Sequence, residues 1–153
     1  MSGMNGLQIA ADLALSQRDA AAQVLASARQ TWLQAQVQLD QLESYAQECT
    51  NRWTVQSGSC TPELMRHHYA FMARLEHAIG LQLHIVGEHG QRVEREALKL
   101  RDAEVRLEGL RQLVASRERE REQLLARREQ KMTDEQAALQ HRRRMSEGLG
   151  DRL

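Results

Sequence analysis

Apolar residues recur along the first third of the chain at alternating spacings of four and three. This spacing predicts one face of an α-helix that packs in a coiled coil. One of the two rows is mostly alanine, so a partner helix can approach closely there, while Leu25, Trp32 and Leu39 in the other row fill space. Arg18 alone breaks the series, which comprises Leu7, Ala11, Ala14, Arg18, Ala21, Leu25, Ala28, Trp32, Ala35, Leu39, Leu42, Ala46, Cys49 and Trp53.

A second apolar series of the same period begins after residue 60. Every seventh residue from Met65 to Val114 is apolar, and the rows beside this one are mixed, with Tyr69, Leu75, Leu83, Ala97 and Leu110. We call each apolar series a seam. When a short loop joins two helices with matching seams, the helices can fold back so that the two seams pack against each other. The pattern therefore predicts an all-α protein in which two long helices form an antiparallel coiled-coil hairpin.

The one dense turn signal of the chain lies between the two series, from Thr54 to Pro62. Gly58 permits a positive φ, Thr61 is a good N-cap, and Pro62 then occupies the first helical position. We expect a single coiled-coil hairpin over residues 1–153. Its first helix covers residues 5–54, a loop covers 55–61, a second helix covers 62–145, and a tail covers 146–153.

The two predicted helices are unequal in length. Reflection about Gly58 places Leu7 opposite residues near Gly109, so the stretch from Arg111 to Arg144 has no partner within the chain. This stretch is rich in strong helix formers with close opposite charges, such as Glu118 and Arg121. We therefore expect the second helix to project beyond the first and to fray after Arg142.

Gly80, Gly87, Gly90 and Gly109 lie within the second predicted helix, where each costs about 1 kcal/mol relative to alanine. Gly90 continues an inner row opposite the Leu25–Trp32 region, so its role is to make room there. The alternative is a bend near residues 87–90.

Composition and charge agree with long exposed helices rather than a bulky core. Aromatic residues are 3% of the chain, and 21 basic residues balance 21 acidic ones. A general nucleic-acid binder is usually clearly basic, so we expect no nucleic-acid partner. Residues 1–18 lack the features of a signal peptide, and no apolar run is long enough to span a membrane. We expect a protein of the reducing cytosol.

The sequence carries no motif for catalysis. It has no phosphate-binding loop, and a long hairpin has no concave pocket in which to assemble a catalytic triad. Cys49, Cys60, His67 and His68 could gather near the loop, but their spacing matches no zinc pattern. We therefore expect no enzymatic activity, cofactor or metal, and we favour free thiols over a Cys49–Cys60 disulfide.

The segment from Tyr69 to Val86 is apolar on two faces. At 100° per residue, the inward stripe holds Tyr69, Met72, Leu75, Ile79, Leu83 and Val86, whereas Phe71, Ala78, Leu81 and Ile85 fall outside it. A two-helix fold has nothing left to cover Phe71. Scattered exposed apolar residues are common, but the helical spacing of these residues favours a partner site.

The projecting arm is a second candidate surface. Its simplest interpretation is a solvated helix of alternating charge. The cluster Arg142–Arg144 could bind acidic protein, nucleic acid or a membrane surface, although it lacks the interleaved aromatics typical of nucleic-acid binding. The candidate partner-binding residues of the arm are Arg117, Arg119, Arg121, Arg127 and Arg128.

Three stretches of the chain carry sequence patterns beyond the apolar repeat. One is Gln41-Leu42-Glu43-Ser44-Tyr45 before the turn, with Arg52 at its edge. The densest runs from Tyr69 to Ile79 with the pattern Tyr-x-Phe-x-x-x-Leu-Glu-x-Ala-Ile, and a further trace covers Gln130 to Ala137. The seven-residue repeat alone does not explain the Tyr69–Ile79 pattern. Together these stretches resemble the FliJ family of flagellar type III export proteins.

The resemblance implies a two-helix coiled coil like the rotor stalk of rotary ATPases. Such proteins sit in the hexameric export ATPase ring, contact the export-gate membrane protein and escort empty export chaperones. This implies a cytoplasmic protein, peripheral to the inner membrane at the flagellar base and needed for motility and chemotaxis. The gate-facing patch corresponds to Phe71, Leu75, Ala78 and Gln82, and Gln82 departs from the basic or His residue expected there.

Two alternatives remain beside a flagellar stalk. One is the equivalent stalk of a virulence-type injectisome. The other is a generic coiled-coil scaffold, or a nucleic-acid-associated protein, that uses a basic C-terminal arm.

Overall fold

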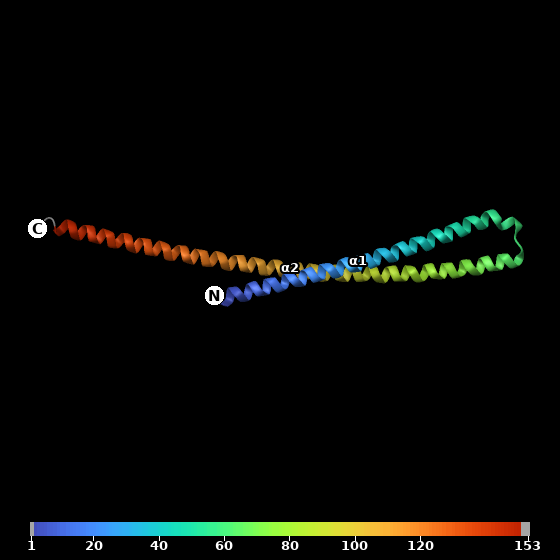
Figure 1. The fold of residues 1–153 in the computed structure, drawn as a ribbon, viewed down its shortest axis with the longest axis horizontal. Helices are drawn as coiled ribbons and strands as arrows, with labels where there is room; N and C mark the ends of the chain where they lie inside the picture. The colour runs from blue at the N-terminus through green and yellow to red at the C-terminus, as the bar shows by residue number, and fades with distance from the viewer. Residues whose placement is uncertain (1, 151–153) are drawn as a thin grey trace. The chain divides into compact units, whose positions relative to one another are not determined.

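The computed structural model describes residues 2–150 and contains two long helices joined by a short turn (Figure 1). Helix α1 spans Ser2–Gln56, the 3₁₀ turn η1 spans Ser57–Ser59, and helix α2 spans Pro62–Gly150. No strand occurs among the described residues. The prediction of an all-α fold with two helices packed against each other, the second longer, is confirmed.

Residues of the turn donate hydrogen bonds to a backbone carbonyl group at the end of α1 that has no partner within the helix. The Oγ of Ser59 and the Sγ of Cys60 both donate to the carbonyl oxygen of Gln56, at 3.2 Å each. Thr61 then caps α2, because its Oγ1 accepts a hydrogen bond from the backbone N–H of Leu64 at 3.3 Å. Gly58 does not adopt the positive φ that its sequence permits, since the chain turns through a 3₁₀ segment instead.

The two helix ends at the turn lie within two residues of their predicted positions. The C-terminal end of α2 lies further from its predicted position. The prediction ended this helix near residue 145, whereas α2 continues to Gly150. No proline interrupts this stretch, and two glycines lower its helix propensity without blocking the backbone hydrogen bonds. Residues 151–153 of the predicted tail lie outside the described part of the chain.

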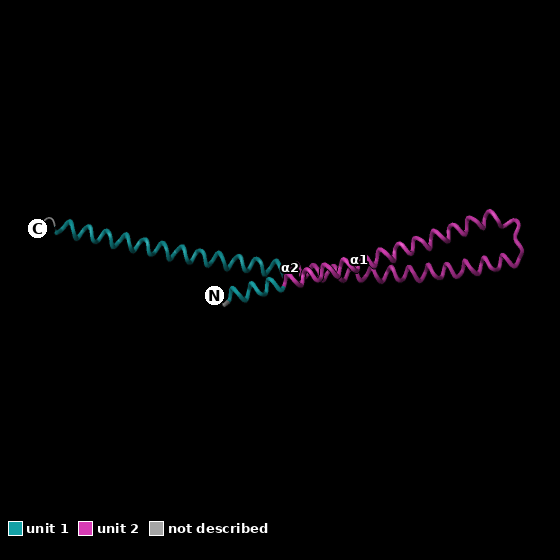
Figure 2. Tube along the Cα trace, in the orientation of Figure 1, with its two compact units in different colours: residues 1–13, 107–153 teal, residues 14–106 magenta. Residues whose placement is uncertain are grey.

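The chain divides into two units, which Figure 2 colours separately. One unit comprises Ala14–Arg106, and in it α1 and α2 run side by side in opposite directions. The other comprises Met1–Leu13 and Leu107–Leu153.

In the unit of residues 14–106, the predicted α1 seam is confirmed. Each of its residues there, including Arg18, is buried or half-buried, and most of the other α1 side chains in this unit are exposed. The most buried are Ala14, Leu25, Ala28, Ala35 and Leu39. The alanines allow close approach of α2, and the leucines fill the remaining space.

The second row of the α2 seam differs from the prediction. Tyr69 and Leu83 were expected to point inward, but they are 61% and 52% exposed. The row instead lies three residues after each member of the first, and it is largely polar. Its members are His68, Leu75, Gln82, His89, Glu96 and Ala103, all buried or half-buried. Of its polar members, Gln82 donates to the carbonyl oxygen of Ala35 and His68 stacks on the ring of Trp53.

Gly90 lies against Trp32, within the region of α1 that the sequence placed opposite it. A Cβ atom placed on Gly90 would lie 3.4 Å from Nε1 and 3.7 Å from Cδ1 of Trp32, whereas one placed on Gly80 or Gly87 would meet nothing within 4 Å. Helix α2 continues through residues 87–90 without interruption.

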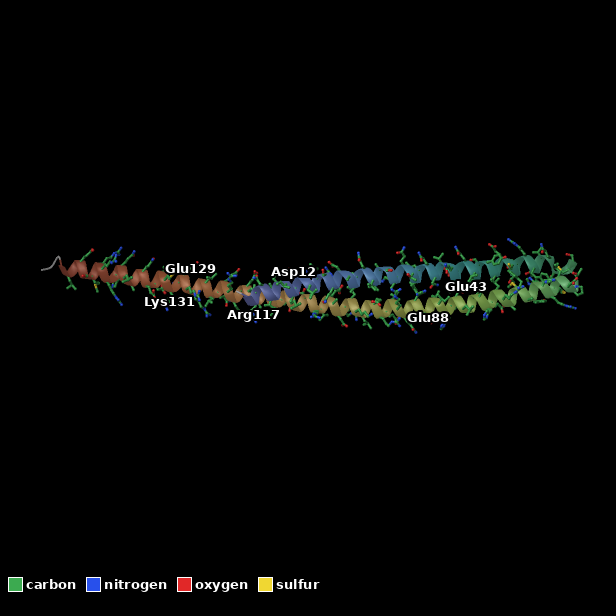
Figure 3. The ribbon with its side chains drawn as sticks, turned by 60° about the horizontal axis from the view of Figure 1, so that its bottom comes forward. Asp12, Glu43, Glu88, Arg117, Glu129 and Lys131 are labelled. Atoms are coloured by element: carbon green, nitrogen blue, oxygen red, sulfur yellow. The ribbon has the colours of Figure 1, made fainter. Side chains whose placement is uncertain are left out.

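In the second unit, a short paired stretch is followed by a long exposed one. Ala11 and Leu107 are buried, and Leu7, Leu110, Val114 and Ser116 are half-buried. From Arg117 to Gly150 every residue is exposed, so the unpaired arm begins about six residues later than the Arg111 predicted from reflection. Figure 3 shows Arg117, Glu129 and Lys131 extending from this part of α2.

Candidate partner-binding surfaces

An apolar surface lies on one side of the hairpin around Phe71. The ring of Phe71 is 38% exposed and meets the ring of Tyr45 on α1 edge to face, with centroids 6.1 Å apart and planes at 87°. Leu81 and Ile85 follow on the same side of α2 and are 55% and 40% exposed. We call Tyr45, Phe71, Ala78, Leu81 and Ile85 the Phe71 face.

Ala78 does not lie fully outside the seam as expected. It is half-buried, because it occupies the line of α2 residues that borders the seam. Phe71 and Ile85 occupy the same line, seven residues away on either side, and with their longer side chains they are 38% and 40% exposed. Ala78 therefore forms the floor of the Phe71 face, and the exposed area belongs to its neighbours.

Leu75 and Gln82, the other two residues of the predicted gate-facing patch, lie in the seam itself. Leu75 is 8% exposed. The Nε2 of Gln82 donates across the seam to the carbonyl oxygen of Ala35 at 2.9 Å and to Oε1 of Gln38 at 3.3 Å. Both residues hold α1 and α2 together beneath the Phe71 face and offer little surface to a partner.

Tyr45 is a member of this face that sequence reasoning did not single out. It is 46% exposed, and its phenol ring supports Phe71 from the opposite helix. A signal was available, because Tyr45 precedes Ala46 of the α1 seam by one residue and Phe71 precedes Met72 of the α2 seam by one residue. Residues that border matching rows of two antiparallel helices meet on the same side of the hairpin.

Two of the four residues considered for metal binding near the turn, Cys60 and His68, make other contacts. The imidazole of His68 stacks on the indole of Trp53, with centroids 4.0 Å apart and planes at 7°. The thiol of Cys60 donates to Gln56, and neither Cys49 nor Cys60 forms a disulfide. Within residues 2–150, no three His, Cys, Asp or Glu side chains gather in a metal-binding group.

The arm presents charged and apolar side chains together. The five candidate arginines, Arg117, Arg119, Arg121, Arg127 and Arg128, are all exposed. Between and beyond them, Leu124, Leu125, Met132 and Leu139 are 49–62% exposed. Local hydrogen bonds stabilise the helix, as between Nε2 of Gln130 and Oδ1 of Asp134 at 3.1 Å. A helix this long and this exposed presents all of its faces to a partner.

Neither described helix contains a stretch apolar and long enough to cross a membrane.

These features define a class of protein: an all-α hairpin of two long helices whose exposed side chains lie on the outer faces of the paired segments and along the unpaired end of α2. The model of the family described as "Flagellar FliJ protein" matches residues 4–146, and the chain belongs to the FliJ family. This is a structural family associated with export, so the protein is related to flagellar type III protein export. Searches of curated proteins and of solved structures returned no match.

Proposed function

We propose that this protein is a central-stalk-like coiled coil of the flagellar export apparatus, without catalytic activity of its own. In this proposal the arm binds the hexameric export ATPase, the Phe71 face binds the export-gate membrane protein, and the hairpin escorts export chaperones. The protein acts in the cytoplasm, at the inner face of the membrane beneath the flagellum. The match to the flagellar family favours this apparatus over a virulence-type injectisome.

The observation that carries the proposal is that each of the two units presents its own exposed surface. The Phe71 face lies over the paired helices of residues 14–106, where Tyr45 and Gln82 fix its position. The arm from Arg117 onward has no paired helix and is exposed at every described residue. A stalk that joins a ring to a membrane gate needs two such independent contact surfaces.

The Phe71 face is tested by the substitution Phe71→Asp. A carboxylate in the middle of an apolar contact loses its hydration without a partner, so binding to the purified cytosolic domain of the export-gate protein should fall at least about tenfold. Isothermal titration calorimetry measures the affinity, and circular dichroism measures helicity and melting. We expect a small change in melting, because Phe71 is more than one-third exposed.

Leu83→Asp is the matched control. Leu83 is 52% exposed and lies on the opposite side of the same helix, outside the Phe71 face. It should bind the gate domain as the unmodified protein does. Equal loss of affinity in both variants, or a collapse of helicity in Phe71→Asp, would show that Phe71 acts through the fold rather than through a partner.

A further inference from the structure

The charged residues of the hairpin are segregated between its two sides. We compared the charged residues beside the seam over the whole unit of residues 14–106, assigning each to a side from its place in the seven-residue repeat. The side that carries the Phe71 face has six basic residues and three acids: Arg52, Arg74, Arg92, Arg95, Lys99, Arg106, Glu48, Glu88 and Asp102. The opposite side has three basic residues and six acids: Arg29, Arg66, Arg101, Asp19, Asp40, Glu43, Glu76, Glu94 and Glu104.

Two of the acids on the Phe71 side, Glu48 and Glu88, lie close to a side chain of their own helix that can donate to them. Glu88 pairs with His84 at 3.1 Å, and Glu48 pairs with Arg52 at 3.9 Å. Across the described residues, Arg74, Arg92 and Arg95 form no hydrogen bond or ion pair. Arg74 and Arg95 are exposed and Arg92 is half-buried, so three uncompensated guanidinium groups border the exposed side chains of Phe71, Leu81 and Ile85.

An apolar centre with a charged border is the usual arrangement of a protein-binding surface, in which the border selects the partner by its charge. We propose that the partner of the Phe71 face is a protein segment that brings apolar side chains to Phe71, Leu81 and Ile85 and acidic side chains to Arg74, Arg92 and Arg95. This inference rests on the proposed function and specifies the chemistry of its gate contact. The acidic opposite side repels the same segment, so the charge pattern also decides which side of the hairpin is bound.

The test compares two triple variants that remove the same charge. The border variant removes the three arginines that border the Phe71 face, by the substitutions Arg74→Gln, Arg92→Gln and Arg95→Gln. Arg29→Gln, Arg66→Gln and Arg101→Gln remove three exposed arginines from the opposite side. The probe is the purified cytosolic domain of the export-gate protein from the same organism, with binding rates measured by surface plasmon resonance at low and high salt.

We expect the border variant to associate roughly tenfold more slowly at low salt and to lose most of the salt dependence of its association rate. The opposite-side variant should match the unmodified protein. If the unmodified protein binds the gate domain but both triple variants behave alike, the acidic partner segment is wrong while the proposed function stands. If the unmodified protein does not bind the gate domain, the proposed gate contact fails and the inference fails with it.

Anionic lipid is the competing occupant of a basic and apolar surface. Vesicles containing phosphatidylglycerol provide the probe in a sedimentation assay. We expect no difference between the two triple variants in this assay. Loss of vesicle binding in the border variant alone would assign the surface to the membrane and overturn the proposal of a protein partner.

Discussion

At the scale of single residues, the seam is shaped by contacts between unlike side chains. Trp32 of α1 packs beside Gly90 of α2, and Gln82 donates to the carbonyl oxygen of Ala35 across the seam. Polar groups inside a coiled coil restrict its register, because other registers leave them without a partner. These two contacts therefore set the alignment on which the Phe71 face depends.

The role of Gly90 is testable by a comparison with Gly80. A Cβ atom at residue 90 already lies in van der Waals contact with the indole of Trp32, so the larger isoleucine side chain crowds it, whereas the same change at residue 80 enters open space. We expect the variant Gly90→Ile to be less stable than Gly80→Ile by about 1–3 kcal/mol in urea unfolding followed by circular dichroism. Since both changes carry the same helix propensity, equal stabilities would mean that Trp32 does not pack against residue 90.

The residue scale is also where sequence reasoning is weakest. The apolar rows were recognised because leucine, valine and tryptophan repeat at fixed spacings. The row with Gln82, His89 and Glu96 was missed because its polar members carry no hydrophobic signal, although each lies three residues after a seam position. Tyr69 and Leu83 were assigned inward from their apolar character alone, and both are exposed. Where polar residues belong to a seam, position in the seven-residue repeat predicts burial better than apolar character does.

At the scale of helices, α1 and the C-terminal part of α2 are stabilised in different ways. Nearly the full length of α1 carries a continuous seam, so its stability derives from burial against α2. The part of α2 beyond Ser116 buries nothing and depends on helix propensity and on local pairs such as Gln130 with Asp134. This difference was predictable from the sequence, because the seven-residue apolar row stops at Val114.

Removal of the arm separates its role from that of the hairpin. Deletion of residues 118–153 should leave the melting temperature nearly unchanged, because the deleted residues described by the structure, 118–150, are all exposed. It should abolish stimulation of the purified hexameric export ATPase in a phosphate-release assay. Full stimulation by the shortened protein would contradict the proposed role of the arm, and a large loss of melting temperature would show that the arm packs on the hairpin.

At the scale of the whole molecule, every proposed function depends on the return of the chain at residues 57–61. The matched periods of the two seams and the turn signal at Pro62 were sufficient to predict this return. The proposed partner-binding surfaces were less predictable. They consist of the residues that remain exposed outside the seam, and the second row of the α2 seam was assigned incorrectly. Family membership then connects the hairpin to flagellar export.

The most direct measurement is the distance between the two helices of the hairpin within one molecule. Spin labels are attached at the exposed residues Gln34 of α1 and Glu88 of α2, each changed to cysteine after Cys49 and Cys60 are replaced by serine. Dilution with unlabelled protein restricts the signal to single molecules. We predict one narrow distance distribution near the width of two packed helices, about 20 Å, in double electron–electron resonance. A distance near the roughly 80 Å that 54 residues span as a continuous helix would contradict the hairpin and the functions proposed for it.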